Sequence, residues 1–309
     1  MSRGPFFWRR IMIYLVDVSV KALLAYHRLY PKERPNVLFS YARCSKDLAN
    51  FLFKNRDIVG SIILDSGTFS LNQNPRKFFK KVTFPGYKAY LRELGSRFDF
   101  YFNFDEDYSK SGFDRNLANQ LDLEKAGLSP VPVVHDCYGD EIPYYIANKH
   151  KYPIVSIGSG ELKNASVAEL RRIVDRLYSN GINVHFLGCT RYPKLAKVPV
   201  SSADSTTWKH AGSRGPLLYW NPHKPRFDKK EEICVGEPRS EKEMKNHIDR
   251  HPQKHEIQEY LERELGYTID DFKKRGGHTK MLVANMHYYV QLEKRIAAEH
   301  RKLGFKFWI

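Results

Sequence analysis

Residues 154–188 read IVSIGSGELKNASVAELRRIVDRLYSNGINVHFLG, and this stretch decides the fold class. Its two ends, Ile154–Gly158 and Asn183–Gly188, are short apolar runs without polar alternation, which is typical of parallel strands buried on both faces. Between them, Ser166-Val-Ala-Glu169 is a capping box that opens an amphipathic helix. The stretch therefore predicts a strand–helix–strand unit of an α/β protein.

The same unit recurs along the rest of the N-terminal part of the chain. The predicted strands are Met12–Asp17, Asn36–Tyr41, Ser61–Asp65, Phe98–Asp105, Val131–Asp136, Ile154–Gly158, Asn183–Gly188 and Val198–Ser202. Ser45 is expected to cap a helix after the second strand. Eight strands with intervening helices predict a (β/α)8 TIM barrel, with a doubly wound open sheet as the alternative. The connection at 190–197 is short and contains Pro193, so we expect no full helix there.

The composition changes after Trp220 and becomes polar and charged, with few strand signals. Leu282–Leu303 is predicted to be a long amphipathic helix that ends at Gly304. We therefore divide the chain into a barrel, residues 1–222, and a mostly helical C-terminal extension packed on it, residues 223–309.

Charge and cysteine content narrow the function classes. The 309 residues include 51 Lys and Arg against 35 Asp and Glu, a net charge of +16 that favours polyanionic partners. A hydrophobic content of 42% excludes disordered and fibrous classes. The cysteines are too widely spaced for a disulfide framework or a four-cysteine zinc site; they are Cys44, Cys137, Cys189 and Cys234. The apolar run from Ile11 is too short to span a bilayer, so a cytoplasmic protein is expected.

Acidic side chains follow five of the eight predicted strands. The segments are Asp65-Ser-Gly, Asp105-Glu106, His135-Asp136, Gly160-Glu161 and Ala203-Asp204-Ser205. Any one of them is explained by helix capping, but in a barrel the carboxyl ends of the strands meet at one mouth, where active sites lie. Crowded carboxylates favour catalysis, and a carboxylate pair is the usual equipment for cleaving a glycosidic bond. Metal-dependent hydrolysis is less favoured because no H-x-H or H-E-x-x-H motif occurs.

The ordered set of motifs resembles that of the tRNA-guanine transglycosylases. The matching segments are Leu64-Asp65-Ser66-Gly67-Thr68-Phe69, Phe104-Asp105-Glu106, Gly158-Ser-Gly160-Glu161, His185-Phe-Leu187-Gly188 and Ala203-Asp204-Ser205. The family's zinc module is absent after the barrel, so the chain is similar to the zinc-free, phage-type enzymes that insert 7-deazaguanines into DNA. The resemblance implies a pentosyltransferase that exchanges guanine for a base such as preQ0 or preQ1, in the host cytoplasm if phage-encoded. DNA is preferred over tRNA as the partner.

The resemblance also implies residue roles. Asp204 would be the nucleophile that forms a covalent sugar intermediate, and Asp65 would be the general acid and base. The substrate-binding residues would be Ser66, Phe69, Asp105, Glu106, His135, Ile157, Gly158, Gly160, Glu161, Leu187 and Gly188. From the basic charge runs we further expect nucleic-acid contacts by Arg76, Lys77, Lys80, Lys81, Arg191 and Lys194.

The sequence leaves several alternative functions open. The first is a transglycosylase that acts on tRNA, and the second is a glycosylase or nucleoside hydrolase that uses the same carboxylates. A third is a nucleic-acid-binding barrel without catalysis. No redox or nucleotide cofactor and no metal are expected, and the oligomeric state is open. His247, His251 and His255 lie near Cys234 in sequence and are interpreted as surface residues of a polar helical segment.

Overall fold

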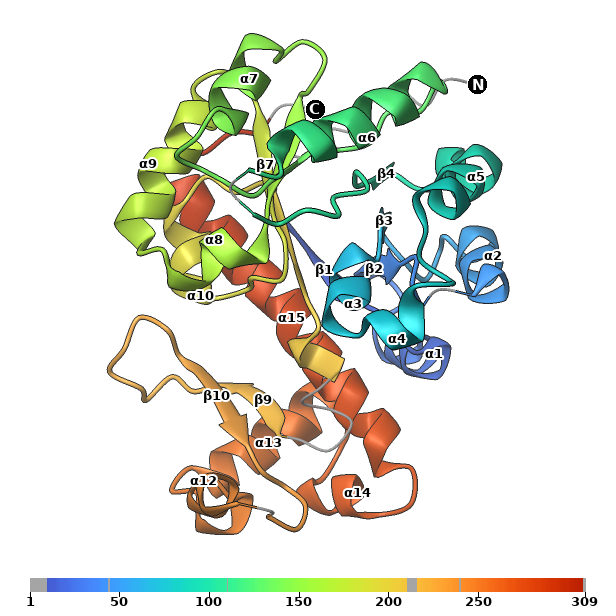
Figure 1. Cartoon of the computed structure of the whole chain (residues 1–309). Helices are drawn as coiled ribbons and strands as arrows, with labels where there is room; N and C mark the ends of the chain where they lie inside the picture. Colours follow the sequence, from blue (N-terminus) through green and yellow to red (C-terminus); the bar gives the residue numbers. More distant parts are fainter. Residues whose placement is uncertain (1–9, 44, 110, 210–215, 239, 308–309) are drawn as a thin grey trace.

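The structure is a computed structural model that describes residues 10–43, 45–109, 111–209, 216–238 and 240–307 (Figure 1). Cys44 lies outside this described part. None of the helices in the described ranges combines the length and the apolar character that a membrane crossing requires.

Eight parallel strands form one curled sheet, which confirms the predicted TIM-barrel fold class. The strands are β1 (Met12–Val16), β2 (Asn36–Ser40), β3 (Ile62–Asp65), β4 (Phe100–Tyr101), β5 (Val133–Val134), β6 (Ile154–Ile157), β7 (Asn183–Phe186) and β8 (Ser202–Ser205). Their order is β4-β3-β2-β1-β8-β7-β6-β5, and a parallel bridge between Phe102 and Val131 joins the two edges. This closure, with β1 paired to both β2 and β8, excludes the doubly wound open sheet.

Helices follow the strands and cover the outside of the sheet (Figure 1). They are α1 (Val20–Leu29), α2 (Lys46–Lys54), α3 (Thr68–Gln73), α4 (Pro75–Phe78), α5 (Phe84–Leu94), η1 (Gly95–Arg97), α6 (Phe113–Lys125), α7 (Glu141–Ala147), α8 (Ser159–Asn164), α9 (Val167–Tyr178) and α10 (Tyr192–Lys197). The predicted Ser45 cap and the Ser166–Glu169 capping box are both present. The expectation of no helix at 190–197 is wrong in part, because Pro193 lies in the first turn of α10, where its missing N–H costs nothing.

After β8 the chain leaves the barrel and returns to it in one long helix (Figure 1). The excursion contains β9 (Leu217–Trp220), β10 (Lys230–Ile233), α12 (Glu241–Lys245), η2 (Ile248–Arg250), α13 (Lys254–Leu265) and α14 (Ile269–Lys273). The last helix, α15 (Gly277–Lys302), packs against α1, α10 and β1, so it occupies the gap in the outer ring between the first and last barrel helices. The antiparallel β9–β10 hairpin was not predicted. The division of the chain at residue 222 stays a prediction.

The buried apolar side chains form two layers. The outer layer, between sheet and helices, contains Ile13 and Leu15 of β1, whereas Tyr14 and Val16 belong to a separate inner cluster. The inner cluster also contains Leu38, Ile63, Phe102, Val131, Val133 and Ile154. Alternate residues of each strand therefore fill the inside of the barrel, as the period of two requires. Side chains that continue this inward series reach the carboxyl ends of the strands.

Candidate active site

Four of the predicted site residues lie at the carboxyl ends of different strands. Asp65 is the last residue of β3, Asp204 lies in β8, and Asp105 and His135 follow β4 and β5. Because the strands are parallel, these ends open on the same mouth of the barrel. Asp105 and His135 belong to one hydrogen-bonded group and Asp204 belongs to a second, whereas Asp65 accepts from the Gly67 N–H and joins neither.

The first group is built on Asp105, which is buried and accepts hydrogen bonds at both carboxylate oxygens. Ser66 Oγ and Thr68 Oγ1 lie 3.2 Å and 3.1 Å from Oδ1, and His135 Nε2 lies 2.9 Å from Oδ2. Tyr108 donates to Thr68 Oγ1 at 2.8 Å and stacks on the His135 ring with centroids 4.8 Å apart. Asp105 is therefore held by donors of the protein itself.

His135 is set up to carry a proton. Burial lowers the pKa of His135, but the hydrogen bond and the negative charge of Asp105 outweigh it and leave the pKa above its usual value. A Cβ atom at Gly158 would lie 2.9 Å from His135 Nδ1, so only glycine leaves that nitrogen its space. With Nε2 engaged by Asp105, Nδ1 is the nitrogen that can donate toward a bound molecule.

The second group is built on Asp204, whose Oδ1 accepts from two donors. The Gly188 N–H lies 2.8 Å away and His185 Nε2 lies 3.2 Å away. Gly188 has a φ of 64°, the left-handed conformation that glycine adopts without strain and that aims its N–H at Asp204. His185 Nδ1 in turn lies 2.8 Å from Ser202 Oγ, so the Ser202 hydroxyl donates to Nδ1 while Nε2–H donates to the carboxylate.

His185 fixes Asp204 from inside the barrel. Its side chain has an exposed fraction of 0%, and its ring centroid lies 4.9 Å from that of Phe102 and 6.0 Å from that of Tyr14. This packing holds the imidazole in one orientation, and the hydrogen bond from His185 then orients the Asp204 carboxylate. The other oxygen of Asp204, Oδ2, has no hydrogen-bond partner among the described residues and is available to a ligand.

Asp65 is a carboxyl group at the mouth whose proton affinity is strongly raised. Its Oδ2 accepts from the Gly67 N–H at 3.0 Å. Burial, followed by the negative charges of Asp105 and Asp204, raises the pKa of Asp65 to about 7. A carboxyl group with such a pKa exists in both protonation states at neutral pH.

The other predicted substrate-binding residues are spread around this mouth. Ser66 is buried against Asp105, whereas Phe69 on α3 is exposed. Glu106 accepts from Arg115 at 2.8 Å and so faces α6. The remaining ones follow or end β6 and β7; they are Ile157, Gly158, Gly160, Glu161, Leu187 and Gly188. The roles assigned to them toward a ligand stay predictions.

The six predicted nucleic-acid contacts fall into two places. Arg76, Lys77, Lys80 and Lys81 lie on or just after α4, and all four are exposed, as is Arg191 before α10. Lys194 is buried, and its ammonium group donates to the carbonyl oxygens of Leu162 and Lys163 near the end of α8. The prediction that Lys194 contacts nucleic acid is therefore wrong, because its charge serves as a cap inside the fold.

Sequence reasoning missed three polar residues of the mouth. His185 was named only as part of the segment His185-Phe-Leu187-Gly188 and was given no role, although its hydrogen bond places it beside Asp204. Tyr108 lies in a loop and carries no local signal. Asp17 follows β1 with a φ of 52° and lies 3.8 Å from both Arg43 Nη1 and Lys209 Nζ. Asp17 ends a predicted strand, as the other acidic residues of the mouth do, and this position could have identified it as a site residue.

Of the C-terminal histidines, His247 lies beside Cys234, with which it forms a parallel β-bridge. The interpretation as surface residues is wrong for His247 and His251, whose side chains are 14% and 6% exposed. His247 Nε2 lies 2.9 Å from the Gly236 carbonyl oxygen, His251 pairs with Glu231 at 3.4 Å, and His255 pairs with Glu259 at 3.3 Å. Within the described ranges, no group of three or more His, Cys, Asp or Glu side chains is placed to hold a metal ion.

Comparison with known proteins finds similarity of fold only. No family model and no curated protein matches the chain. A solved structure of a putative fructose-1,6-biphosphate aldolase from Coccidioides immitis is 10% identical, with 95% of this chain and 93% of that chain covered and a TM-score of 0.50. A putative dihydrodipicolinate synthase family protein from the same organism is 10% identical over 97% of each chain, with a TM-score of 0.44. An enolase protein from Sargasso Sea environmental sequences is 10% identical over 64% of this chain and 54% of that one, with a TM-score of 0.38.

The comparison corrects the expectation drawn from the motifs. The neighbour with a TM-score of 0.50 is described as a putative fructose-1,6-biphosphate aldolase and not as a tRNA-guanine transglycosylase. The resemblance to that family, the glycosyltransferase activity and the exchange of guanine for a 7-deazaguanine are therefore wrong. The physical reason is that Asp, Ser and Gly recur wherever a parallel strand turns into a helix, so five short motifs of these residues arise in order in unrelated barrels.

Proposed function

We propose that the chain is a barrel enzyme that transfers a proton on a small anionic substrate, at a carbon next to a carbonyl group. The observation that carries this proposal is the pKa of Asp65, which burial and the charges of Asp105 and Asp204 raise to about 7. A group that both removes and returns a proton works best when its pKa is close to the pH of operation.

The two hydrogen-bonded groups supply complementary parts of this reaction. The Asp65 carboxylate takes the proton from carbon, the C–H electron pair forms a carbon–carbon double bond, and the carbonyl π pair moves to the oxygen. Asp105 raises the pKa of His135 and so favours its protonated form, which donates from Nδ1 to that enolate oxygen. Asp65 then returns its proton to carbon. Burial and the charge of Asp105 keep the pKa of Asp65 high, and the charge of Asp204, held by His185 and Gly188, adds to this effect.

The anionic nature of the substrate is inferred from two cations, Arg43 after β2 and Lys209 after β8, which lie beside Asp17 at the end of β1. Arg43 and Lys209 share the carboxylate of Asp17 at 3.8 Å each, and their side chains are 52% and 42% exposed. Ion pairs of this length on exposed side chains contribute little to stability. Both cations are therefore free to exchange Asp17 for a phosphate or carboxylate group of the substrate.

The experiment is proton exchange with solvent, followed by NMR in D2O. A panel of phosphorylated aldehydes, ketones and keto acids, each with its unphosphorylated counterpart, is incubated with the protein. We expect deuterium to replace a hydrogen next to the carbonyl of an anionic member, with a rate that rises through about pH 7 as Asp65 ionises. Absence of exchange across the panel, or exchange that is equally fast without the protein, would contradict the proposal.

A second candidate function is nucleic-acid binding, and one surface favours it. Phe69 and Phe79 are 53% and 56% exposed beside the cations Arg76, Lys77, Lys80 and Lys81. Exposed aromatic rings among basic side chains are typical of surfaces on which bases stack and phosphates pair.

Salt dependence tests this second candidate. If the surface contacts duplex DNA, the logarithm of the association constant falls with the logarithm of salt concentration, by about 0.9 for each phosphate neutralised. Replacing both Lys80 and Lys81 by alanine is expected to reduce that slope by roughly 2, while Lys125→Ala on α6 leaves it unchanged. Equal slopes for all three proteins would place DNA elsewhere or nowhere on the chain.

A further inference from the structure

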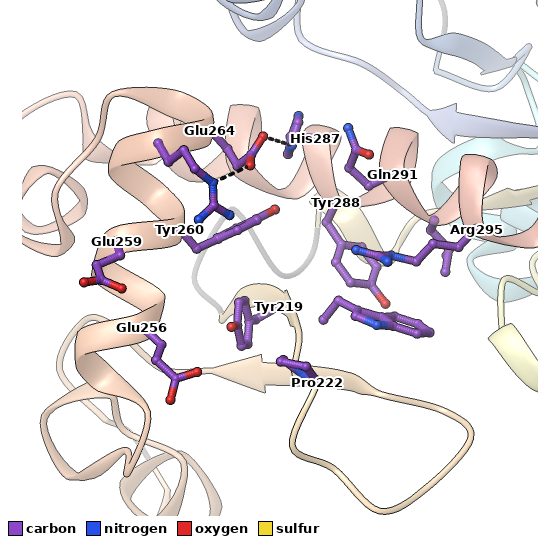
Figure 2. A pocket seen from close by; sticks show the side chains of 13 residues that line it. Tyr219, Pro222, Glu256, Glu259, Tyr260, Glu264, His287, Tyr288, Gln291 and Arg295 are labelled. Atoms are coloured by element: carbon purple, nitrogen blue, oxygen red, sulfur yellow. Dashed lines mark hydrogen bonds and ion pairs between the residues drawn. The ribbon is translucent and has the colours of Figure 1, made fainter.

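A cavity lies outside the barrel, between α13, α15 and the β9–β10 hairpin (Figure 2). Its volume is about 450 Å³, within the range of small-molecule sites. Helix α13 provides Glu256, Glu259 and Glu264, α15 provides His287 and Tyr288, and β9 provides Tyr219 (Figure 2). It shares no residue with the candidate active site.

His287 presents an unpaired acceptor at this cavity. The ring is 1% exposed, and Nδ1 lies 3.5 Å from the hydroxyl oxygen of Tyr26. Tyr26 donates its own proton to Glu33 at 3.0 Å, so Nδ1 carries the hydrogen and the lone pair is on Nε2. Nε2 is buried without a hydrogen-bond partner in the described structure. An orphaned buried acceptor of this kind costs free energy unless a donor from outside satisfies it.

A carboxylate stands next to that acceptor. Glu264 Oε2 lies 3.8 Å from His287 Nε2, which is too long for a hydrogen bond but short enough for one donor nitrogen to reach both atoms (Figure 2). Burial lowers the pKa of His287, although the charges of Glu264 and Glu33 oppose this. The imidazole therefore stays neutral at pH 7 and adds no positive charge beside Glu264 Oε2, while Glu264 Oε1 is paired with Arg263.

The rest of the lining favours a cation with an apolar body. The rings of Tyr219 and Tyr260 lie 5.4 Å apart edge to face, and aromatic faces attract cations. The cavity is lined by three carboxylates and by two guanidinium groups, those of Arg263 and Arg295. Its lining is therefore more acidic than the chain as a whole, whose net charge is +16. Both arginines have partners. Arg263 Nε forms an ion pair with Glu264 Oε1 at 3.0 Å, and the guanidinium carbon of Arg295 lies 4.9 Å from the centroid of the Trp220 ring.

A second orphan lines the same cavity. The hydroxyl of Tyr288 is buried and has no hydrogen-bond partner among the described residues. It offers a polar contact to the part of a ligand that does not reach Glu264.

We propose that this cavity binds a small organic cation, an alkyl guanidinium or ammonium compound whose N–H groups donate to His287 Nε2 and Glu264 Oε2. The aromatic side chains enclose its apolar part. The site is independent of the chemistry at the barrel mouth.

Calorimetric titration of the full chain with n-butylguanidinium and with n-butylurea tests the proposal, because the two probes differ in charge and hardly in shape. We expect the guanidinium to bind at least tenfold more tightly than the urea. Binding of both with equal affinity, or of neither, would overturn the proposal.

Two variants on one helix provide the matched comparison. Glu264→Gln removes the lining charge, and Glu262→Gln removes an exposed charge of α13 that does not line the cavity. We expect affinity for n-butylguanidinium to fall at least tenfold in the first and to stay unchanged in the second. If Glu264→Gln does not fold, Tyr288→Phe is tested in its place, because this change removes only the orphan hydroxyl. We expect Tyr288→Phe to weaken the binding of n-butylguanidinium about threefold. Unchanged affinity in the Glu264 variant, or in the Tyr288 variant used in its place, would contradict the assignment.

Discussion

Asp65→Asn is expected to lower the rate of proton exchange about a thousandfold and, at the same time, to stabilise the protein at pH 8. A positioned general base contributes roughly 10²- to 10⁴-fold, and an amide cannot take up the proton. The amide oxygen of asparagine can still accept from the Gly67 N–H, so the local turn is preserved. The exchange assay in D2O measures the first effect.

The stability effect follows from the direction of the pKa shift. The pKa of Asp65 is raised from 3.8 to about 7, so the fold favours the protonated carboxyl group. The favourable contribution of that group is present in full below pH 3.8 and is lost as the pH rises through 7. Asparagine stays neutral at every pH, and we expect a gain on the order of 3 kcal/mol at pH 8 and almost none at pH 4.

Urea unfolding at the two pH values measures this gain. Asp136→Asn is the control, since Asp136 also follows β5 at a strand end and accepts from the Tyr138 N–H at 2.9 Å. Its replacement is expected to leave both exchange and stability near those of the unchanged protein. An Asp65 variant that is less stable at pH 8, or that exchanges protons at the original rate, would refute the role of Asp65.

Glu293→Gln is expected to have the largest effect on stability outside the barrel mouth. Glu293 lies on α15, and its Oε2 accepts from the Ile13 N–H at 2.8 Å and from Asn36 Nδ2 at 3.0 Å. Burial raises the pKa of Glu293 from 4.5 to about 7, although both hydrogen bonds and the charge of Arg10 oppose the shift. Its contribution is therefore present in full below pH 4.5 and is lost as the pH rises through 7.

Glutamine can accept both hydrogen bonds through its amide oxygen and does not ionise. We expect a gain on the order of 2 kcal/mol at pH 8, reduced by the lost ion pair with Arg10 at 3.7 Å, and no gain at pH 4. Thermal unfolding at both pH values checks this, with the exposed Glu262→Gln as the control. A loss of stability at pH 8 would show that the buried carboxylate is stabilised in its charged form.

Much of the barrel could be predicted because its strands are apolar on both faces. The prediction was least accurate at β8, placed at Val198–Ser202 but found at Ser202–Ser205. This strand consists of small and polar residues, so it has no apolar run of its own. The apolar run lies in the segment before it, and the prediction followed that run. The hairpin strand β10, Lys230–Ile233, was missed because charged side chains hide its alternation.

Part of the candidate site could also be predicted from the order of the strands. Parallel strands bring their carboxyl ends together, so the grouping of Asp65, Asp105 and Asp204 follows from strand order alone. The role of His185 depends on a hydrogen bond to Asp204 on the neighbouring strand β8, and Tyr108 reaches Thr68 from a loop. Such contacts have no signature in spacing. The family resemblance was wrong because strand-end turns share the same few residues in many barrels.

The measurement that tests the account most directly is a 13C NMR titration of the Asp65 carboxyl group, identified by its absence from the spectrum of Asp65→Asn. We expect a midpoint at about pH 7 in the unchanged protein and a lower midpoint in Asp204→Asn, where one of the charges that raise it is removed. A midpoint near 3.8 in the unchanged protein would contradict the proposed acid–base role.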